Sequence, residues 1–276
     1  MATPTEIMCV GNELLIGKTL NTNAHWLAKR ATSLGAMVKR ITVVGDNVDE
    51  IAAALQEALK RKPKFLIMTG GLGPTFDDKT SEGIAKGLRR KLKVNQKALS
   101  MVKKKYEAYL AAGKMERIEM TPSRIKMATF PEGAEPLHNP VGTAPGMRAK
   151  TMGTLLIALP GVPPEMEAIF DESVAGMLEK EAGKVSFYEA STYANHIMES
   201  SLAPLIDKVM HDNPHVYVKS HVYTKSDFQT EGQKPHIELH FSTRVSNPKT
   251  AKSLLKNAMD QLSELVRKNG GKTETR

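Results

Sequence analysis

The sequence predicts an α/β protein with a mostly parallel sheet covered by helices on both faces, followed by a second, small α+β domain. Apolar strands alternate with helix-length amphipathic segments up to about residue 180, which is typical of right-handed crossovers. Gly11, Gly45 and Gly70 each follow a strand, at the edge where ligands of such sheets gather. The pattern changes near Glu181–Lys184. We therefore expect domains at residues 1–183 and 184–276.

Hydrophobic periodicity defines the elements of the first domain. Strands are expected at 6–10, 37–44, 65–68 and 154–159. Helices are expected at 21–34, 48–59, 80–88, 96–112 and 162–180. The segment 121–148 is rich in Pro and Gly, so loops and short strands are expected there. In the second domain, strands are expected at 185–191, 216–222 and 236–245, and helices at 195–210 and 250–266, with a polar linker at 224–234.

Composition narrows the class of protein. The chain has 276 residues, 41% hydrophobic and 25% charged, as is ordinary for a globular protein. Its single cysteine, Cys9, excludes an intramolecular disulfide and a cysteine metal cluster, and it is expected to be an inert core thiol. No apolar run is long enough to span a membrane and no signal-peptide pattern is present, so a cytoplasmic protein without membrane partners is expected. The formal charge of +9 fits an anionic partner and a solvated basic surface equally well.

The segment Thr69–Thr80 (TGGLGPTFDDKT) combines glycines with two adjacent carboxylates. A strand, a glycine-rich turn and a helix start form an anion site, in which backbone N–H groups approach a phosphate. The residues expected to bind phosphate are Thr69, Gly70, Gly71, Gly73, Pro74 and Thr75. Asp77 and Asp78 fit such a site only with a cation between them and the phosphates. One of the two is expected to cap the following helix and the other to be free for a metal.

Carboxylates also follow two other strands. Asp46 ends a strand at the same sheet edge, where it can hold the same metal, cap the next helix, or do both. Glu13 is either a ligand or base, or a loop carboxylate that organises the turn after it. Asn21, Thr22 and Asn23 can bind phosphate or ribose, although residues of these types before a helix are first of all caps. On the strand 236–245, His236, Glu238 and His240 share one face, which is more typical of a solvated surface than of a metal site with His221.

Six motifs in order resemble one known family. They are GNELLIG (11–17), NTN (21–23), VVGDN (43–47), the 69–80 loop, NPVGTAPG (139–146) and LPGVPPEM (159–166). Together they resemble the N-terminal module of the CinA (competence/damage-inducible) proteins, within the molybdopterin-binding, molybdenum-cofactor-biosynthesis fold. The resemblance covers residues 6 to about 175, and the tail resembles the small extension that follows this module. The chain ends before a deamidase domain would begin, so none is expected.

The resemblance implies a three-layer α/β/α fold and a metal-dependent pyrophosphatase, a hydrolase acting on ADP-ribose or a related nucleoside diphosphate compound. It implies a divalent cation (Mg, Mn or Co) on Asp46 and Asp78, with Asp77 or Glu13 assisting catalysis. Further substrate-binding residues are expected at Asn21, Asn23, Asn139, Gly142, Thr143, Gly161 and Glu165. For Glu165 the helix start alone accounts for a carboxylate. Members of this fold self-associate, so a homo-oligomer, dimer or trimer, is expected.

Two alternatives remain beside hydrolysis. The related molybdenum branch binds molybdopterin and transfers a nucleotidyl group to it, using the positions that fall on Asp46 and Asp78. Asp77 has counterparts mainly in the CinA branch, which favours hydrolysis modestly. A noncatalytic nucleotide- or RNA-binding protein is the other alternative. The tail has neither a Gly-X-X-Gly loop nor a recognisable aromatic stacking motif, so a small nucleotide is the expected partner and nucleic acid is not.

Overall fold

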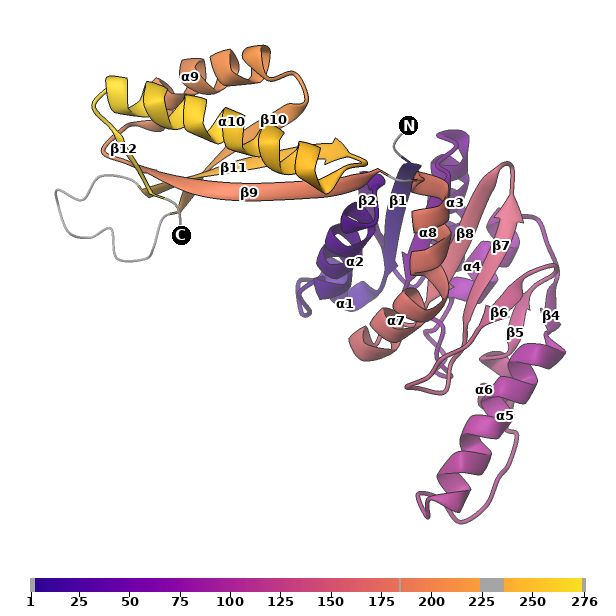
Figure 1. The fold of residues 1–276 in the computed structure, drawn as a ribbon. Coiled ribbons are helices and arrows are strands. Elements are labelled where there is room, and N and C mark those ends of the chain that lie inside the picture. The colour runs from indigo at the N-terminus through magenta and orange to yellow at the C-terminus, as the bar shows by residue number, and fades with distance from the viewer. Residues whose placement is uncertain (1–2, 184, 224–235, 275–276) are drawn as a thin grey trace. The chain divides into compact units, whose positions relative to one another are not determined.

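The computed structural model describes residues 3–183, 185–223 and 236–274 (Figure 1). The chain divides into two compact units, Met1–Ala182 and Gly183–Arg276. The sequence placed this boundary between residues 183 and 184. The expected polar linker at 224–234 lies outside the described residues.

Unit 1 is built on a six-stranded sheet. Its order is β2 (Ala36–Val44), β1 (Thr3–Val10), β3 (Phe65–Thr69), β8 (Thr154–Leu159), β7 (Gly146–Thr151) and β6 (Glu135–Leu137). The first four strands pair in parallel, and β7 and β6 continue the sheet antiparallel. The predicted α/β class with a mostly parallel sheet is confirmed.

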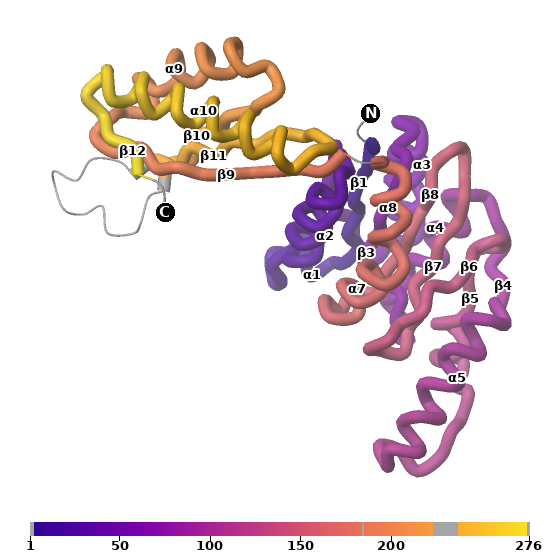
Figure 2. The backbone as a smooth tube through the Cα atoms, in the orientation of Figure 1, coloured from indigo at the N-terminus to yellow at the C-terminus, as the bar shows by residue number. Residues whose placement is uncertain are grey.

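Helices cover both faces of this sheet. One face carries α3 (Val48–Lys60), α4 (Thr80–Gly87) and α5 (Gln96–Ala111). The other carries α2 (Thr22–Ser33), α7 (Pro163–Ile169), the π-helical turn η1 (Phe170–Val174) and α8 (Ala175–Ala182). The remaining elements are α1 (Asn12–Leu15), α6 (Pro122–Lys126) and the small pair β4 (Leu92–Val94) and β5 (Thr129–Pro131). The α5 helix extends away from the rest of unit 1 (Figure 2).

The alternation of side chains along the strands explains the two layers. In β1, Met8 and Val10 pack in the core beneath α3, whereas Ile7 and Cys9 pack beneath α2. Both sets are buried because helices cover both faces, and such strands are almost continuously apolar. Each fully buried aliphatic side chain contributes about 1.5–3 kcal/mol of transfer free energy.

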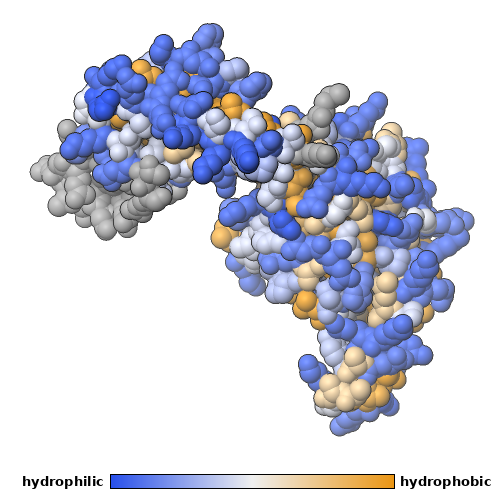
Figure 3. Space-filling model, viewed as in Figure 1, coloured by the Kyte–Doolittle hydropathy of each residue, from blue (hydrophilic) through white to orange (hydrophobic). Residues whose placement is uncertain are grey.

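Unit 2 has the order β9 (Ser186–Asn195), α9 (Glu199–Asp212), β10 (Val216–Tyr223), β11 (His236–Val245), α10 (Pro248–Lys268) and β12 (Lys272–Glu274). The sheet order is β10-β11-β9-β12, and its pairs are antiparallel. This is the β-α-β-β-α-β, ferredoxin-like arrangement. Its core lies between one sheet face and the two helices. The visible surface over α9 and α10 is mainly hydrophilic (Figure 3). None of the described helices has the length and apolar character that crossing a membrane requires.

Candidate functional site

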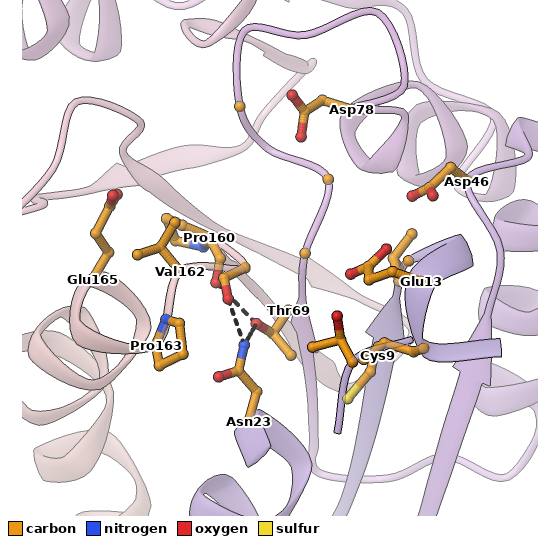
Figure 4. A pocket seen from close by; sticks show the side chains of 18 of the residues that line it. Cys9, Glu13, Asn23, Asp46, Thr69, Asp78, Pro160, Val162, Pro163 and Glu165 are labelled. Atoms are coloured by element: carbon orange, nitrogen blue, oxygen red, sulfur yellow. Dashed lines mark hydrogen bonds between the residues drawn. The ribbon is translucent and has the colours of Figure 1, made fainter. Parts of the chain in front are cut away.

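The carboxyl ends of β1, β2, β3 and β8 meet at a cavity of about 440 Å³ (Figure 4). The first turns of α2 and α7 and the 70–78 loop complete its wall. In parallel sheets this edge collects the loops that follow several strands, so residues distant in sequence converge there.

Most of the predicted site residues line this cavity: Glu13, Asn21, Asn23, Asp46, Thr69, Gly70, Gly71, Gly73, Pro74, Asp77, Asp78, Thr143, Gly161 and Glu165. Three do not line it, namely Thr75, Asn139 and Gly142. Each of the three instead contacts or positions a carboxylate of the wall, as described below.

The glycine loop is shaped by close packing at its start. Gly70 has φ +104°, and a Cβ there would lie 2.1 Å from the carbonyl oxygen of Val10. The buried hydroxyl of Thr80 donates to the Gly70 carbonyl at 2.7 Å, and the Thr80 amide donates to Gly71 at 3.0 Å. The amides of Gly71 and Gly73 donate no hydrogen bond within the described part of the chain. They remain available to an anion in the cavity.

Asp77 and Asp78 are tied to Thr75, and neither caps α4. The prediction that one of them is the cap was wrong, because the N-cap residue is Lys79 and no side chain caps this helix. The Thr75 amide donates to Asp78 at 2.8 Å, and the Thr75 hydroxyl lies 2.6 Å from an oxygen of each carboxylate. The hydrogen bond from Thr75 is the main cause of a lowered pKa of Asp77. Asp77 is therefore ionised and a weak proton acceptor.

Asp46 is held by the chain that follows β1. The Asn12 amide donates to an Asp46 carboxylate oxygen at 2.8 Å, and the Asp46 amide donates to the Asn12 side chain at 3.2 Å. The alternative in which Asp46 caps the next helix was wrong, since the Asn47 side chain accepts from the amides of Asp49 and Glu50. The helix start is satisfied without Asp46, whose carboxylate borders the cavity.

Glu13 lies in the short helix α1 and is exposed. Its carboxylate has no hydrogen bond or ion pair to any described residue, in contrast to Asp46, Asp77 and Asp78. A Cβ on Gly11 would lie 2.5 Å from this carboxylate, so the side chain folds back over the end of β1. Among the described carboxylates that line the cavity, the Glu13 carboxylate is the one that no hydrogen bond holds in place.

The two asparagines of the 21–23 motif have different roles. Asn21 caps α2, because its side chain accepts from the Ala24 amide at 3.0 Å, as the cap interpretation predicted. Asn23 bridges two strand ends by donating to the Thr69 hydroxyl at 3.2 Å and to the Gly161 carbonyl at 2.8 Å (Figure 4). Thr69 in turn donates to the Pro160 carbonyl at 2.9 Å. These bonds join the ends of β3 and β8 at the floor of the cavity.

Asn139 positions Glu165 on the far side of the cavity from Asp46 and Glu13 (Figure 4). Buried Asn139 donates to Glu165 at 2.6 Å and to the Ala144 carbonyl at 2.8 Å, and its oxygen accepts from two loop amides. A Cβ on Gly142 would lie 2.0 Å from the Glu165 carboxylate. Asn139 has both donors and its acceptor engaged, so its effect on a ligand is exerted through Glu165 and the loop.

The charge of the cavity is one-sided. Glu13, Asp46, Asp77, Asp78 and Glu165 line it, and none of the described residues that line it is Lys, Arg or His. These carboxylates would repel an anionic ligand, so an anion would bind in the cavity only together with a cation that offsets their charge. Within the described residues no three His, Cys, Asp or Glu side chains are gathered closely enough to hold a metal by themselves. Mg²⁺-type ions need only one or two carboxylates when phosphate oxygens and water complete the shell, so the donor set fits a cation that binds with its ligand.

Three residues of the site were not predicted from the sequence. Asn12 anchors Asp46, Thr80 anchors the glycine loop, and Lys126 donates its ammonium group to the Thr75 carbonyl. Asn12 is the second residue after β1 and Thr80 is the second residue after Asp78, so the sequence near each predicted feature indicated them. Lys126 comes from α6, 51 residues away from Thr75, and no local pattern indicates it.

Two other expectations concern residues outside the carboxylate wall. Cys9 is fully buried in β1 beside the cavity, and burial raises the pKa of its thiol. In unit 2, His240 pairs with Glu189 at 3.1 Å, and the rings of His221 and His240 lie 6.2 Å apart. Among the described side chains these residues form no metal-binding group.

The family sequence model described as "Probable molybdopterin binding domain" matches residues 6–180. The chain belongs to this family. A protein of Metallosphaera sedula is 40% identical over 266 residues, and the alignment covers 96% of this chain and 95% of the relative. Protein PAE0875 of Pyrobaculum aerophilum is 43% identical over 261 residues, and the alignment covers 95% of this chain and 93% of the relative. A crystal structure of "the protein CinA with unknown function" from Thermoplasma acidophilum is 42% identical, with a TM-score of 0.57, covering 66% of this chain and 99% of that one. The predicted resemblance to the CinA N-terminal module is confirmed.

Proposed function

We propose that the cavity of unit 1 binds molybdopterin or a related phosphate-bearing ligand together with a divalent cation, and that the protein transfers a nucleotidyl group onto the pterin phosphate. The observation that carries this proposal is a wall of five carboxylates next to the amides of Gly71 and Gly73. Among the described residues, no basic side chain lines this wall and no group accepts from these two amides. Membership of the molybdopterin-binding family supports the pterin ligand.

Different residues of the cavity would bind different parts of such a ligand. The Gly71 and Gly73 amides would donate to phosphate oxygens, where they stabilise charge that develops during transfer. Asp46 and Asp78 would hold the cation, since each is already oriented by a backbone amide, from Asn12 and Thr75 respectively. Asp77 would remain ionised beside them because its pKa is lowered by Thr75. When bound, the cation would offset phosphate charge and polarise the phosphorus–oxygen bonds.

Hydrolysis of the diphosphate of ADP-ribose, giving AMP and a sugar phosphate, is the second candidate. One observation favours it: Glu13 is a cavity carboxylate whose side chain has no partner among the described residues. A free carboxylate can take a proton from water as the water attacks phosphorus. Similarity to CinA agrees with this candidate, although the structure from Thermoplasma is itself described as having unknown function.

A substrate-by-metal screen with the full chain tests both candidates. ATP with molybdopterin, and separately ADP-ribose, FAD, NAD and nucleoside diphosphate sugars, would be incubated with Mg²⁺, Mn²⁺ or Co²⁺. Transfer should give adenylylated pterin and release the β- and γ-phosphates of ATP as pyrophosphate, whereas hydrolysis of ADP-ribose should give AMP and a sugar phosphate. Chelation should abolish either activity. Product formation that persists at full rate with a chelator would exclude the role of the cation.

Asp78→Asn supplies the matched test of the wall. It removes the charge while it keeps the shape, so we expect turnover to fall about a hundredfold or more with an unchanged circular dichroism spectrum. Asp207→Asn is the control, because Asp207 is an exposed residue of α9 in unit 2. Equal turnover of both variants would contradict the proposal that Asp78 binds the cation.

A further inference from the structure

Arg244 of unit 2 carries a charge that nothing in the described structure pairs. It lies near the end of β11, directly opposite Phe187 of β9. Its guanidinium carbon is 5.5 Å from the centre of the Phe187 ring. The Nη1 atom is shielded from solvent and has no hydrogen-bond partner among the described residues. A guanidinium with this much contact and no acceptor is unusual, because buried polar groups are nearly always hydrogen-bonded.

Arg244 does not avoid the cost of a partly buried, unpaired charge by losing its proton. Burial lowers its pKa, but arginine starts so high that it remains a cation at neutral pH. The cation–π contact with Phe187 offsets part of the cost of desolvation, and it provides no hydrogen-bond acceptor in the plane of the guanidinium. The group that would satisfy them is an oxyanion, since a guanidinium forms paired hydrogen bonds with carboxylates and phosphates.

A cavity of about 420 Å³ opens beside this group. Phe187, Met210 and Tyr217 supply apolar surface to it, and His215 and Ser242 supply polar side chains. None of the described residues that line it is Asp or Glu. The cavity thus pairs one uncompensated cation with apolar walls, a combination that suits a small amphipathic anion.

We propose that this cavity is a second ligand site, in which Arg244 pairs with the carboxylate or phosphate of a small molecule whose apolar part lies against Phe187 and Met210. Every residue of the site belongs to unit 2, between residues 187 and 244. The inference goes beyond the proposed function of unit 1 and does not depend on it.

Nuclear magnetic resonance of the full chain tests the site directly. The Nε–Hε signal of Arg244, identified by its loss in Arg244→Lys, would be followed during titration with sodium phosphate and, separately, sodium acetate. Sodium chloride at matched ionic strength is the control. We expect the signal to shift and saturate with at least one oxyanion. Saturation with phosphate alone assigns a phosphate ligand, and saturation with acetate alone a carboxylate. A response to both oxyanions no larger than the response to chloride would overturn the proposal, whatever happens at the cavity of unit 1.

Variants then distinguish the specific effect of the Arg244 guanidinium from the effect of positive charge in general. With the Ser242 backbone amide as reporter, Arg244→Met should weaken binding of the effective oxyanion about tenfold to a hundredfold, since a charge-assisted hydrogen bond is lost. Arg244→Lys keeps the charge without the planar fork and should fall between. Arg267→Met removes an exposed charge from α10 of the same unit and should change nothing. Undiminished binding in Arg244→Met would exclude Arg244 as the anion partner.

Discussion

At the scale of single residues, one hydroxyl organises the acidic end of the glycine loop. Thr75 does not line the cavity, yet its hydroxyl is 2.6 Å from Asp77 and from Asp78, and it has a single proton to give. The hydrogen bond from Thr75 is the main cause of the lowered pKa of Asp77. A folded-state pKa below the unfolded value stabilises the fold above the unfolded pKa, and that contribution is lost as the pH falls through the folded pKa.

Thr75→Val tests this assignment. Valine has nearly the shape of threonine and no hydroxyl, so the pKa of Asp77 should rise toward its usual range. Carbon-13 titration of the side-chain carboxyl groups measures the shift. Thr75→Ser, which retains the hydroxyl, should leave the Asp77 pKa low. An Asp77 pKa that is equally low in Thr75→Val would show that Thr75 is not the cause.

The same residues mark what the sequence could and could not predict about the site. Asp46, Asp77, Asp78 and Glu13 were found from sequence because each follows a predicted strand or glycine turn, and position at a strand end is local information. The capping roles assigned to Asp46 and to the Asp77–Asp78 pair were wrong, because distant or loop donors from Asn12 and Thr75 compete for these carboxylates. Which donor wins depends on the tertiary arrangement, which sequence spacing does not contain.

At the scale of elements, the site depends on how closely the ends of β1, β3 and β8 approach each other. Gly70 is in contact with the Val10 carbonyl, and its amide donates to the Leu159 carbonyl at 3.1 Å. Gly161 is also close to Gly70, because a Cβ added to Gly161 would lie 3.3 Å from the Cα of Gly70. Three strand ends therefore meet at one glycine, where no side chain fits.

Gly70→Ala should show this constraint. The added methyl group would meet backbone rather than a movable side chain, and φ +104° is strained for alanine. We expect a loss of about 3 kcal/mol or more in the free energy of unfolding, measured by urea denaturation. The matched control is Gly176→Ala in α8, where a Cβ meets nothing within 4 Å. That change should be neutral or stabilise the protein by up to about 1 kcal/mol. Similar losses in both variants would contradict the packing argument.

Elements with strong periodicity were well predicted, and those fixed by pairing were not. The strands at 65–68 and 154–159 and the helix at 96–112 match β3, β8 and α5 to within one residue at each end. The expected helix at 162–180 is interrupted by the π-helical turn at Phe170–Val174, where Phe170 packs edge-on against Trp26 at 5.3 Å. Short strands such as β4 and β12 exist only through pairing with a distant partner, which local patterns do not show.

At the scale of the whole molecule, the chain has separate cores for its two units. Leu55 of α3 is buried in the core of unit 1, and Leu262 of α10 is buried in the core of unit 2. All the described residues that line the proposed cation cavity belong to unit 1, and all those that line the proposed Arg244 site belong to unit 2. Each function is thus expected to depend on the stability of its own unit.

A pair of cavity-creating variants tests this independence. Leu262→Ala and Leu55→Ala each remove a fully buried side chain, and each should destabilise its own unit by about 2–5 kcal/mol. Hydrogen exchange followed by mass spectrometry should show Leu262→Ala lowering the protection of peptides from unit 2 while those of unit 1 keep theirs. Leu55→Ala should give the reverse pattern. Loss of protection across both units in either variant would mean that the two cores unfold as one cooperative structure, and the two ligand sites would then share a common stability.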